Sequence, residues 1–259
     1  MLITIDIGNT HIVVGIYRQA EIVAHWRLTT ATERTADEYR ALLGNLLREA
    51  GLSPADITGA IIACVVPPLL STFEELCTRA FGLSPAVVRP GLKTGLRIRT
   101  DNPREVGADR VANAVAAQHQ YGTPAVIIDF STATTFDAIS AGGDFLGNAI
   151  APGLILSAHA LFRHAAQLPH IALANPPGPI GTNTIHSMQS GVVFGHVALV
   201  EGMVKRFRQA LGPDAHIIAT GEYATGEYAN LIVPQCGVIQ TVAPNLTLEG
   251  LRLIYEMNT

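Results

Sequence analysis

The first ten residues bring four groups that could hold a phosphate chain into one short turn. An apolar run ends at Asp6, and Gly8, Asn9 and Thr10 follow before a second apolar run begins. Glycine and asparagine tolerate the positive φ angles of tight hairpins, so the segment predicts two antiparallel strands joined by a polar turn. A backbone without Cβ lets phosphate oxygens approach N–H groups, and a carboxylate can hold a hydrated Mg²⁺. The turn therefore predicts a phosphate cradle.

A second segment repeats this pattern nearly half the chain later. The apolar run Ala125–Ile128 ends at Asp129, and a short polar turn and further apolar residues follow. Solenoid repeats are about 20–50 residues long, so the wider spacing predicts a duplicated domain. Two such turns facing each other would give each wall of a cleft a phosphate cradle. Either turn taken alone is compatible with an ordinary hairpin.

A third candidate is the run Gly107–Arg110, near the start of a predicted helix that extends from Pro103 to about His119. Asp109 and Arg110 are neighbours, so they point in different directions and are poorly placed to pair with each other. The helix dipole favours the ionised form of a carboxylate near the N-terminus, as at Asp109. A solvated charge pair on a helix face is the alternative reading.

The elements that must position these residues alternate between strand and helix patterns. In the first half, three predicted strands lead into a helix whose apolar residues recur at i, i+3, i+4, i+7 and i+8. The predicted bounds are 36–50 for this helix, 59–66 for a strand, 69–81 for a helix and 86–89 for a strand.

The second half repeats the order of three strands, helix, strand and helix. Thr184 is predicted to cap a long helix over 185–211 that several glycines interrupt, and a strand is predicted over 237–242. A closing helix is predicted over 246–255. Both halves therefore belong to the α/β class, with lobes expected at 1–117 and 118–259.

Composition excludes several classes of protein. Hydrophobic residues make up 48% of the 259 residues and charged residues 15%, which favours a globular chain with a large core. The net charge of −4 offers no basic surface for nucleic acid, and the longest apolar stretch, 60–70, is too short for a membrane helix. Three cysteines without paired spacing predict reduced thiols and a cytoplasmic location, and the scattered histidines predict no zinc site.

Beyond these features, the sequence resembles the type III pantothenate kinases along almost its whole length. A single Asp-x-Gly-x-Thr would be a weak signal, but all of the family's motifs occur here in order. The matching segments are Asp6-x-Gly8-Asn9-Thr10, Asn102-Pro103-x-Glu105-Val106-Gly107-Ala108-Asp109-Arg110, Asp129-x-x-Thr132-Ala133-Thr134-Thr135, Pro152-Gly153, Leu168-Pro169, Gly181-x-Asn183-Thr184, Met188-Gln189-Ser190-Gly191 and Gly250-Leu251-x-x-Ile254-Tyr255.

The resemblance implies a fold, a reaction and a site. The fold would be the duplicated βββαβα plan of the actin, Hsp70 and sugar-kinase superfamily, which is ribonuclease H-like. The reaction would be ATP-dependent phosphorylation of pantothenate to 4'-phosphopantothenate, the first step of coenzyme A biosynthesis, with Mg²⁺ present. The enzyme would be a homodimer whose partner subunit closes the substrate pocket, and neither nucleic acid nor a membrane would be a partner.

The resemblance also implies a role for each matching residue. Asp129 would bind a monovalent cation, K⁺ or NH₄⁺. Pantothenate would be held by Gly107, Ala108, Asp109, Arg110 and Thr184, with Asp109 as the general base. The residues implied to contact ATP are Asp6, Ile7, Gly8, Asn9, Thr10, His11, Ile12, Val13 and Thr132.

Three residues depart from the family pattern. Ser131 replaces a glycine of the second turn, Glu222 replaces a second glycine after Gly221, and Thr100 stands where a tyrosine is common. Ser131 and Glu222 leave open a catalytically impaired homologue that binds nucleotide or pantothenate and acts in regulation. A different small-molecule kinase or a polyphosphate-acting enzyme is a further alternative, against which the run 102–110 argues.

Overall fold

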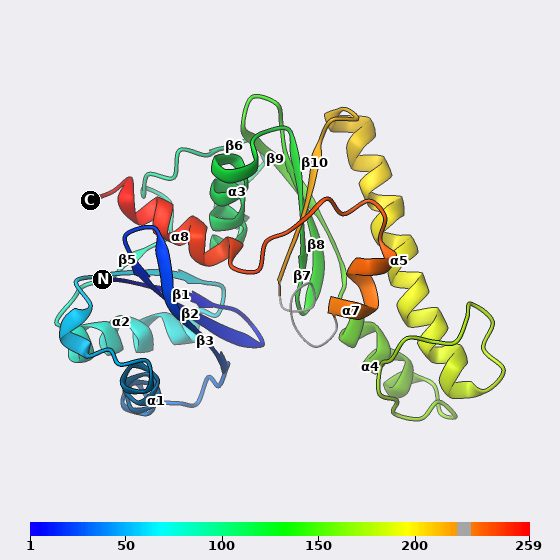
Figure 1. Ribbon diagram of the computed structural model, residues 1–259, viewed down its shortest axis with the longest axis horizontal. Coiled ribbons are helices and arrows are strands. Elements are labelled where there is room, and N and C mark those ends of the chain that lie inside the picture. The colour runs from blue at the N-terminus through cyan, green and yellow to red at the C-terminus, as the bar shows by residue number, and fades with distance from the viewer. Residues whose placement is uncertain (222–228) are drawn as a thin grey trace. The chain divides into compact units, whose positions relative to one another are not determined.

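The computed structural model describes residues 1–221 and 229–259, which form two compact units (Figure 1). Unit 2 comprises Arg97–Thr100 and Ala117–Asn245. Unit 1 comprises Met1–Leu96, Asp101–Ala116 and Leu246–Thr259, so the last helix returns to it, whereas the predicted lobes assigned that helix to the second half. The apolar positions of the last helix pack on the sheet of unit 1, a contact that sequence order alone does not reveal.

Unit 1 is built on a five-stranded mixed sheet in the order β3-β2-β1-β4-β5. β1 pairs antiparallel with β2 and parallel with β4, as expected for a hairpin followed by a helical crossover. The strands are β1 Leu2–Ile7, β2 His11–Arg18, β3 Glu21–Thr29, β4 Gly59–Cys64 and β5 Ala86–Val87. The helices are α1 Ala36–Glu49, η1 Pro54–Asp56, α2 Pro67–Phe81, η2 Pro103–Glu105, α3 Ala108–Tyr121 and α8 Leu246–Glu256, and the boundary between the units falls within α3, after Ala116.

The two faces of this sheet are covered by different helices (Figure 1). Ile3, Ile5 and Ile7 share a buried cluster with residues of α1 and α2. Because side chains alternate along a strand, Thr4 and Asp6 project from the opposite face, where α8 lies. Gly15 of β2 pairs with Thr4 of β1, and a Cβ on Gly15 would lie 2.9 Å from Leu248 Cδ1 of α8. Asp6 therefore lies on the α8 face of the sheet.

Unit 2 repeats this topology with one strand added. Its sheet has the order β11-β10-β7-β8-β9-β6, so β9-β8-β7-β10-β11 corresponds to β3-β2-β1-β4-β5. The strands are β6 Arg97–Ile98, β7 Ala125–Phe130, β8 Ala133–Ile139, β9 Asp144–Pro152, β10 His216–Thr220 and β11 Thr241–Val242. Asp6 and Asp129 are each the penultimate residue of the corresponding strand, which confirms the predicted duplication.

The helices of unit 2 pack on the sheet face opposite Asp129. Val126, Ile128 and Phe130 share a buried cluster with Val193 and Val200. Since Asp129 alternates with Ile128 and Phe130, its side chain projects from the other face. The helices are α4 Leu154–His164, α5 Thr184–Leu211, α7 Ala229–Ile232 and η3 Val233–Gln235.

Three local predictions for unit 2 were wrong. α5 is continuous over 28 residues, although several glycines lie within it, because burial of its valines outweighs the low helix propensity of glycine. Its cap is Asn183, whose side chain accepts a hydrogen bond from the His186 amide at 2.9 Å, so Thr184 is the first helical residue. The strand predicted over 237–242 is reduced to β11, Thr241–Val242. Among the described residues, no helix is both long and apolar enough to cross a bilayer.

Candidate active site

The β1–β2 turn is held rigidly from within. The Gly8 amide donates to the His11 carbonyl at 3.0 Å, and a Cβ on Gly8 would lie only 2.9 Å from the same oxygen. Thr30 ties the turn to the end of β3, because its hydroxyl donates to the Gly8 carbonyl at 2.7 Å and its amide to the Thr10 carbonyl at 2.9 Å. Asn9 and Thr10 remain exposed at the tip. The turn is thus a preorganised loop whose polar groups face outward.

Asp6 is half-buried just before this turn, at the carboxyl end of β1. Cys64 ends the neighbouring strand β4, where it is the parallel partner of Ile7. Burial raises the pKa of the Cys64 thiol, and the nearby charge of Asp6 raises it further. Cys64 is therefore a neutral neighbour of the Asp6 carboxylate rather than a competing anion.

The start of α3 lies beside the same strand ends. The Val65 amide, just after β4, donates to the Ile7 carbonyl at 3.0 Å, and a Cβ on Gly107 would lie 3.5 Å from Val65 Cγ1. That same Cβ would overlap Asp109 Oδ1, so the carboxylate occupies the space that a side chain at position 107 would fill. Asp109 Oδ1 also accepts a hydrogen bond from the Arg110 amide at 2.8 Å. Unit 1 therefore brings the Asp6 turn and the run 107–110 to one edge of its sheet.

The helix bearing Asp109 begins later than the sequence predicted. Asn102 caps a short 3₁₀ turn, η2, by accepting from the Arg104 amide at 3.3 Å and donating to Glu105 Oε1 at 2.7 Å. The helical bonding of α3 then begins where the Val111 amide donates to the Gly107 carbonyl at 3.1 Å. This break places Asp109 in the first turn of α3, where the dipole favours an anion.

In unit 2, Gly221 lets the end of β10 approach Asp129 closely. Asp129 pairs with Thr220 in the parallel register of β7 and β10. Gly221 has φ +92°, and a Cβ there would overlap Asp129 Oδ1 and lie 2.6 Å from the Phe130 carbonyl oxygen. A carboxylate and a carbonyl oxygen thus gather around Gly221, and hard cations take such donors. No group of three or more His, Cys, Asp or Glu side chains that could hold a metal occurs among the described residues.

The turn after Asp129 is shorter than the first and differently supported. Phe130 pairs with Thr134, whereas Ile7 pairs with Ile12, so this turn has one residue fewer. The Ser131 hydroxyl donates to the Ala133 carbonyl at 3.3 Å, within its own turn. Thr132 is exposed, and its carbonyl accepts from the Gly153 amide at 3.2 Å.

The Pro152-Gly153 motif supports this turn from below. A Cβ on Gly153 would lie 2.5 Å from the Ser131 carbonyl oxygen, so glycine is required where β9 meets the turn. Thr134, the second residue of β8, shares a 2.9 Å hydrogen bond between its Oγ1 and Nε2 of His196 in α5. Burial lowers the pKa of His196 to about 4, so this imidazole is neutral near pH 7.

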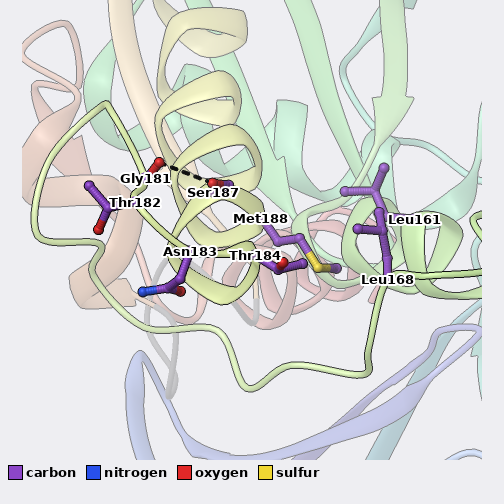
Figure 2. A pocket seen from close by; sticks show the side chains of 8 residues that line it. All are labelled: Leu161, Leu168, Gly181, Thr182, Asn183, Thr184, Ser187 and Met188. Atoms are coloured by element: carbon purple, nitrogen blue, oxygen red, sulfur yellow. Dashed lines mark hydrogen bonds between the residues drawn. The ribbon is translucent and has the colours of Figure 1, made fainter.

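Thr184 lies apart from that turn in an open pocket of about 560 Å³ within unit 2 (Figure 2). Figure 2 shows leucine side chains on one side of the pocket and polar groups from the loop and the first turn of α5 on the other. The lining residues are Leu161, Leu168, Gly181, Thr182, Asn183, Thr184, Ser187 and Met188. The pocket thus offers apolar and hydrogen-bonding walls to a single ligand.

Two buried polar residues hold the loop that walls this pocket. Gln189 donates from its amide to the Ala172 carbonyl at 2.9 Å, and Ser190 donates from its hydroxyl to the Pro179 carbonyl at 2.7 Å. Both lie in the motif 188–191, whose role the sequence pattern did not indicate. The signal that could have found them is a pair of polar side chains inside an otherwise apolar helix.

The other two residues that depart from the family pattern are Thr100 and Glu222. Thr100 is half-buried, and its hydroxyl oxygen has no hydrogen-bond partner among the described residues. Glu222 lies outside the described residues. The predicted site residues 6–13 and 107–110 fall in unit 1, and Asp129, Thr132 and Thr184 fall in unit 2.

Comparisons with known proteins bear on the family of this chain. A family model described as type III pantothenate kinase matches residues 2–206. The type III pantothenate kinase of Roseiflexus sp. (strain RS-1) is 52% identical over 258 residues, covering 100% of this chain and 99% of that protein. The type III pantothenate kinase of Moorella thermoacetica is 48% identical over 259 residues, covering 100% of both chains.

Solved structures extend the comparison at the level of the fold. A Campylobacter jejuni protein assigned to the Baf family of transcriptional activators aligns with TM-score 0.61 and 16% identity over 99% of this chain and 98% of that one. The activator of the 2-hydroxyisocaproyl-CoA dehydratase from Clostridium difficile, with bound ADPNP, gives 0.53 and 12% over 99% and 93%. These likenesses, together with the repeated sheet order, support the predicted duplicated α/β fold. On its motifs, its fold and its full-length relatives, the chain belongs to the type III pantothenate kinase family.

Proposed function

We propose that the protein transfers the γ-phosphoryl group of ATP to the primary hydroxyl of pantothenate, giving 4'-phosphopantothenate and ADP in the first step of coenzyme A biosynthesis. The observation that carries the proposal is the seating of the Asp109 carboxylate over Gly107, at the same sheet edge as the Asp6 turn. A kinase needs such a carboxylate near its phosphate cradle to orient an alcohol. Neither the described residues nor the relatives favour an impaired regulatory homologue.

In this reaction Asp109 is the general base. Its carboxylate accepts the proton of the pantothenate hydroxyl as that oxygen bonds to the γ-phosphorus and the bond from phosphorus to the ADP oxygen breaks. The hydrogen bond from the Arg110 amide holds this carboxylate in a defined orientation. The guanidinium of Arg110 is suited to the substrate carboxylate, because its planar fork binds carboxylates in bidentate fashion.

ATP is bound by the two turns in this proposal. Residues 6–13 and Thr132 contact ATP, chiefly its phosphates, and the Asp6 carboxylate would hold a hydrated Mg²⁺ beside them. Asp129 binds the monovalent cation, K⁺ or NH₄⁺. The support for that assignment is the pair of oxygens around Gly221, from Asp129 and from the Phe130 carbonyl. These ions would neutralise charge that develops during transfer.

Pantothenate is bound by residues 107–110 and by Thr184. The pocket around Thr184 suits this substrate, because pantothenate combines dimethyl and methylene groups with hydroxyl, amide and carboxylate groups. We also propose a homodimer with the substrate site at the subunit interface. Its support is a set of exposed apolar side chains in unit 2, which a second copy would cover: Leu146, Ile150, Leu156, Phe162 and Ile185. The three free cysteines support a reducing, cytoplasmic location.

A coupled assay with ATP, Mg²⁺, K⁺ and pantothenate tests the reaction, with mass spectrometry of the product. Asp109→Asn is expected to lower kcat by at least about 100-fold, the usual contribution of a general base. Asp37→Asn is the matched control, because Asp37 also lies in the first turn of a helix but is exposed, and it should keep full activity. Pure folded protein that forms no phosphopantothenate would refute the reaction. An active Asp109→Asn variant would refute the base assignment alone.

A further inference from the structure

We infer that Thr247 and Gly250 of α8 are positioning residues for phosphoryl transfer. They fix the rotation of α3 about its own axis and its distance from α8, and hence the position of the Asp109 carboxylate. The inference rests on the proposed role of Asp109. It also gives a purpose to the motif Gly250-Leu251-x-x-Ile254-Tyr255, which the reaction itself does not use. The residues concerned all lie in unit 1.

The first contact is a hydrogen bond between the two helices. Thr247 Oγ1 donates to Asn113 Oδ1 at 2.8 Å. Asn113 has 0% of its surface exposed and lies four residues after Asp109, on the same side of α3. A bond to this side chain sets the angle of α3 about its own axis, and that angle determines where the Asp109 carboxylate points.

The second contact is a close approach of the two backbones. A Cβ on Gly250 would overlap the Ala112 carbonyl group and lie 2.9 Å from Ala112 Cα. Backbone atoms cannot rotate away as a flexible side chain can, so any larger residue at position 250 must push the helices apart. Gly250 thus sets the distance between α3 and α8.

α3 needs such constraints because most of its buried positions are alanines. Ala112, Ala114 and Ala116 are each 0% exposed. Small side chains form shallow ridges that interlock weakly, so apolar packing alone leaves the rotation and translation of a helix poorly defined. The polar bond at Thr247 and the backbone contact at Gly250 supply the missing definition.

α8 is itself a rigid support. Tyr255 packs on Gly59 of β4, where a Cβ would lie 2.7 Å from the Tyr255 ring carbon that carries the hydroxyl. Arg252, only 8% exposed in its side chain, pairs with Glu249 and with Glu256 at 2.6 Å, and its guanidinium lies 5.8 Å from the centre of the Tyr17 ring. The last helix of the chain is therefore fastened to the sheet that carries Asp6.

Thr247→Val tests the inference, because valine keeps the shape of threonine and removes only the hydroxyl. We expect kcat to fall about five- to twentyfold while both KM values stay within about twofold, since a small displacement of a base affects the transition state more than binding. Thr247→Ser should restore kcat to within about twofold. Gly250→Ala should lower kcat further, and amide exchange in residues 108–112 should be faster in both damaging variants.

Ile57→Val is the control for stability. Ile57 is 3% exposed in the core of unit 1, and the substitution destabilises by an amount similar to the loss of one hydrogen bond. It should leave kcat unchanged. A Thr247→Val variant that behaves like Ile57→Val, with lower stability and normal kcat, overturns the inference. A wild-type protein without any turnover overturns the proposed function, and the inference with it.

Discussion

The substitution Gly107→Ala tests the geometry of the base directly. A Cβ at position 107 would overlap Asp109 Oδ1, whereas its distance to Val65 Cγ1, 3.5 Å, is an ordinary contact. Gly107 does not have a positive φ, so alanine adds no backbone strain at this position. The clash therefore falls on the carboxylate alone, which must move by about 1 Å or turn away from Gly107.

The size of the effect follows from this displacement. Misplacing a reacting group by 1 Å lowers a rate by about 100-fold, which corresponds to about 2.7 kcal/mol in the activation free energy. The free energy of unfolding should change less, by about 1 kcal/mol, because at most the hydrogen bond from the Arg110 amide to Asp109 is weakened. We thus expect a large loss of kcat in a protein that is still folded.

Steady-state kinetics with both substrates and urea unfolding provide the two measurements. Gly44→Ala is the matched control, because Gly44 lies in α1 and a Cβ added there would have no atom of the described residues within 4 Å. Its alanine variant should be about 1 kcal/mol more stable and fully active. If Gly107→Ala is folded and its kcat lies within about threefold of the wild type, the position of the Asp109 carboxylate does not limit the reaction.

Two further predictions concern unit 2. Ser190→Ala removes the hydroxyl that holds the Pro179 carbonyl, so the wall of the pocket loosens. KM for pantothenate should therefore rise about three- to tenfold, while KM for ATP is unchanged. Equal changes in both KM values would contradict this prediction. The pKa of His196 is about 4 in the folded protein, against an ordinary value of 6.5. Between these two pH values the unfolded chain binds more protons than the folded one. The contribution of His196 to stability is therefore fully present above pH 6.5 and is lost as the pH falls toward 4. Urea unfolding at pH 7.5 and 4.5 should therefore show a loss that is up to about 3 kcal/mol smaller in His196→Gln, and parallel losses in the two proteins would refute the assignment.

The sequence pattern alone predicted those features that are encoded within one short segment of the chain. The apolar runs that end at Asp6 and Asp129, each followed by a short polar turn and further apolar residues, predicted both hairpins, since this signal lies within a few residues. Those two carboxylates occupy equivalent strand positions, and the correspondence of the two sheet orders confirms the duplication. The family motifs predicted the membership that the full-length relatives show. The individual roles of the site residues stay predictions.

Only the tertiary structure decided the features that depend on contacts between distant segments. Asn183 rather than Thr184 caps α5, although either side chain is suitable, because the wall loop sets the backbone entering the helix. The Ser131 hydroxyl bonds within its own turn, which its residue type alone did not determine. The last helix joins unit 1 and meets α3 through Thr247 and Gly250. Sequence records the order and pattern of residues, but a contact between the last helix and α3 depends on packing that only the folded chain establishes.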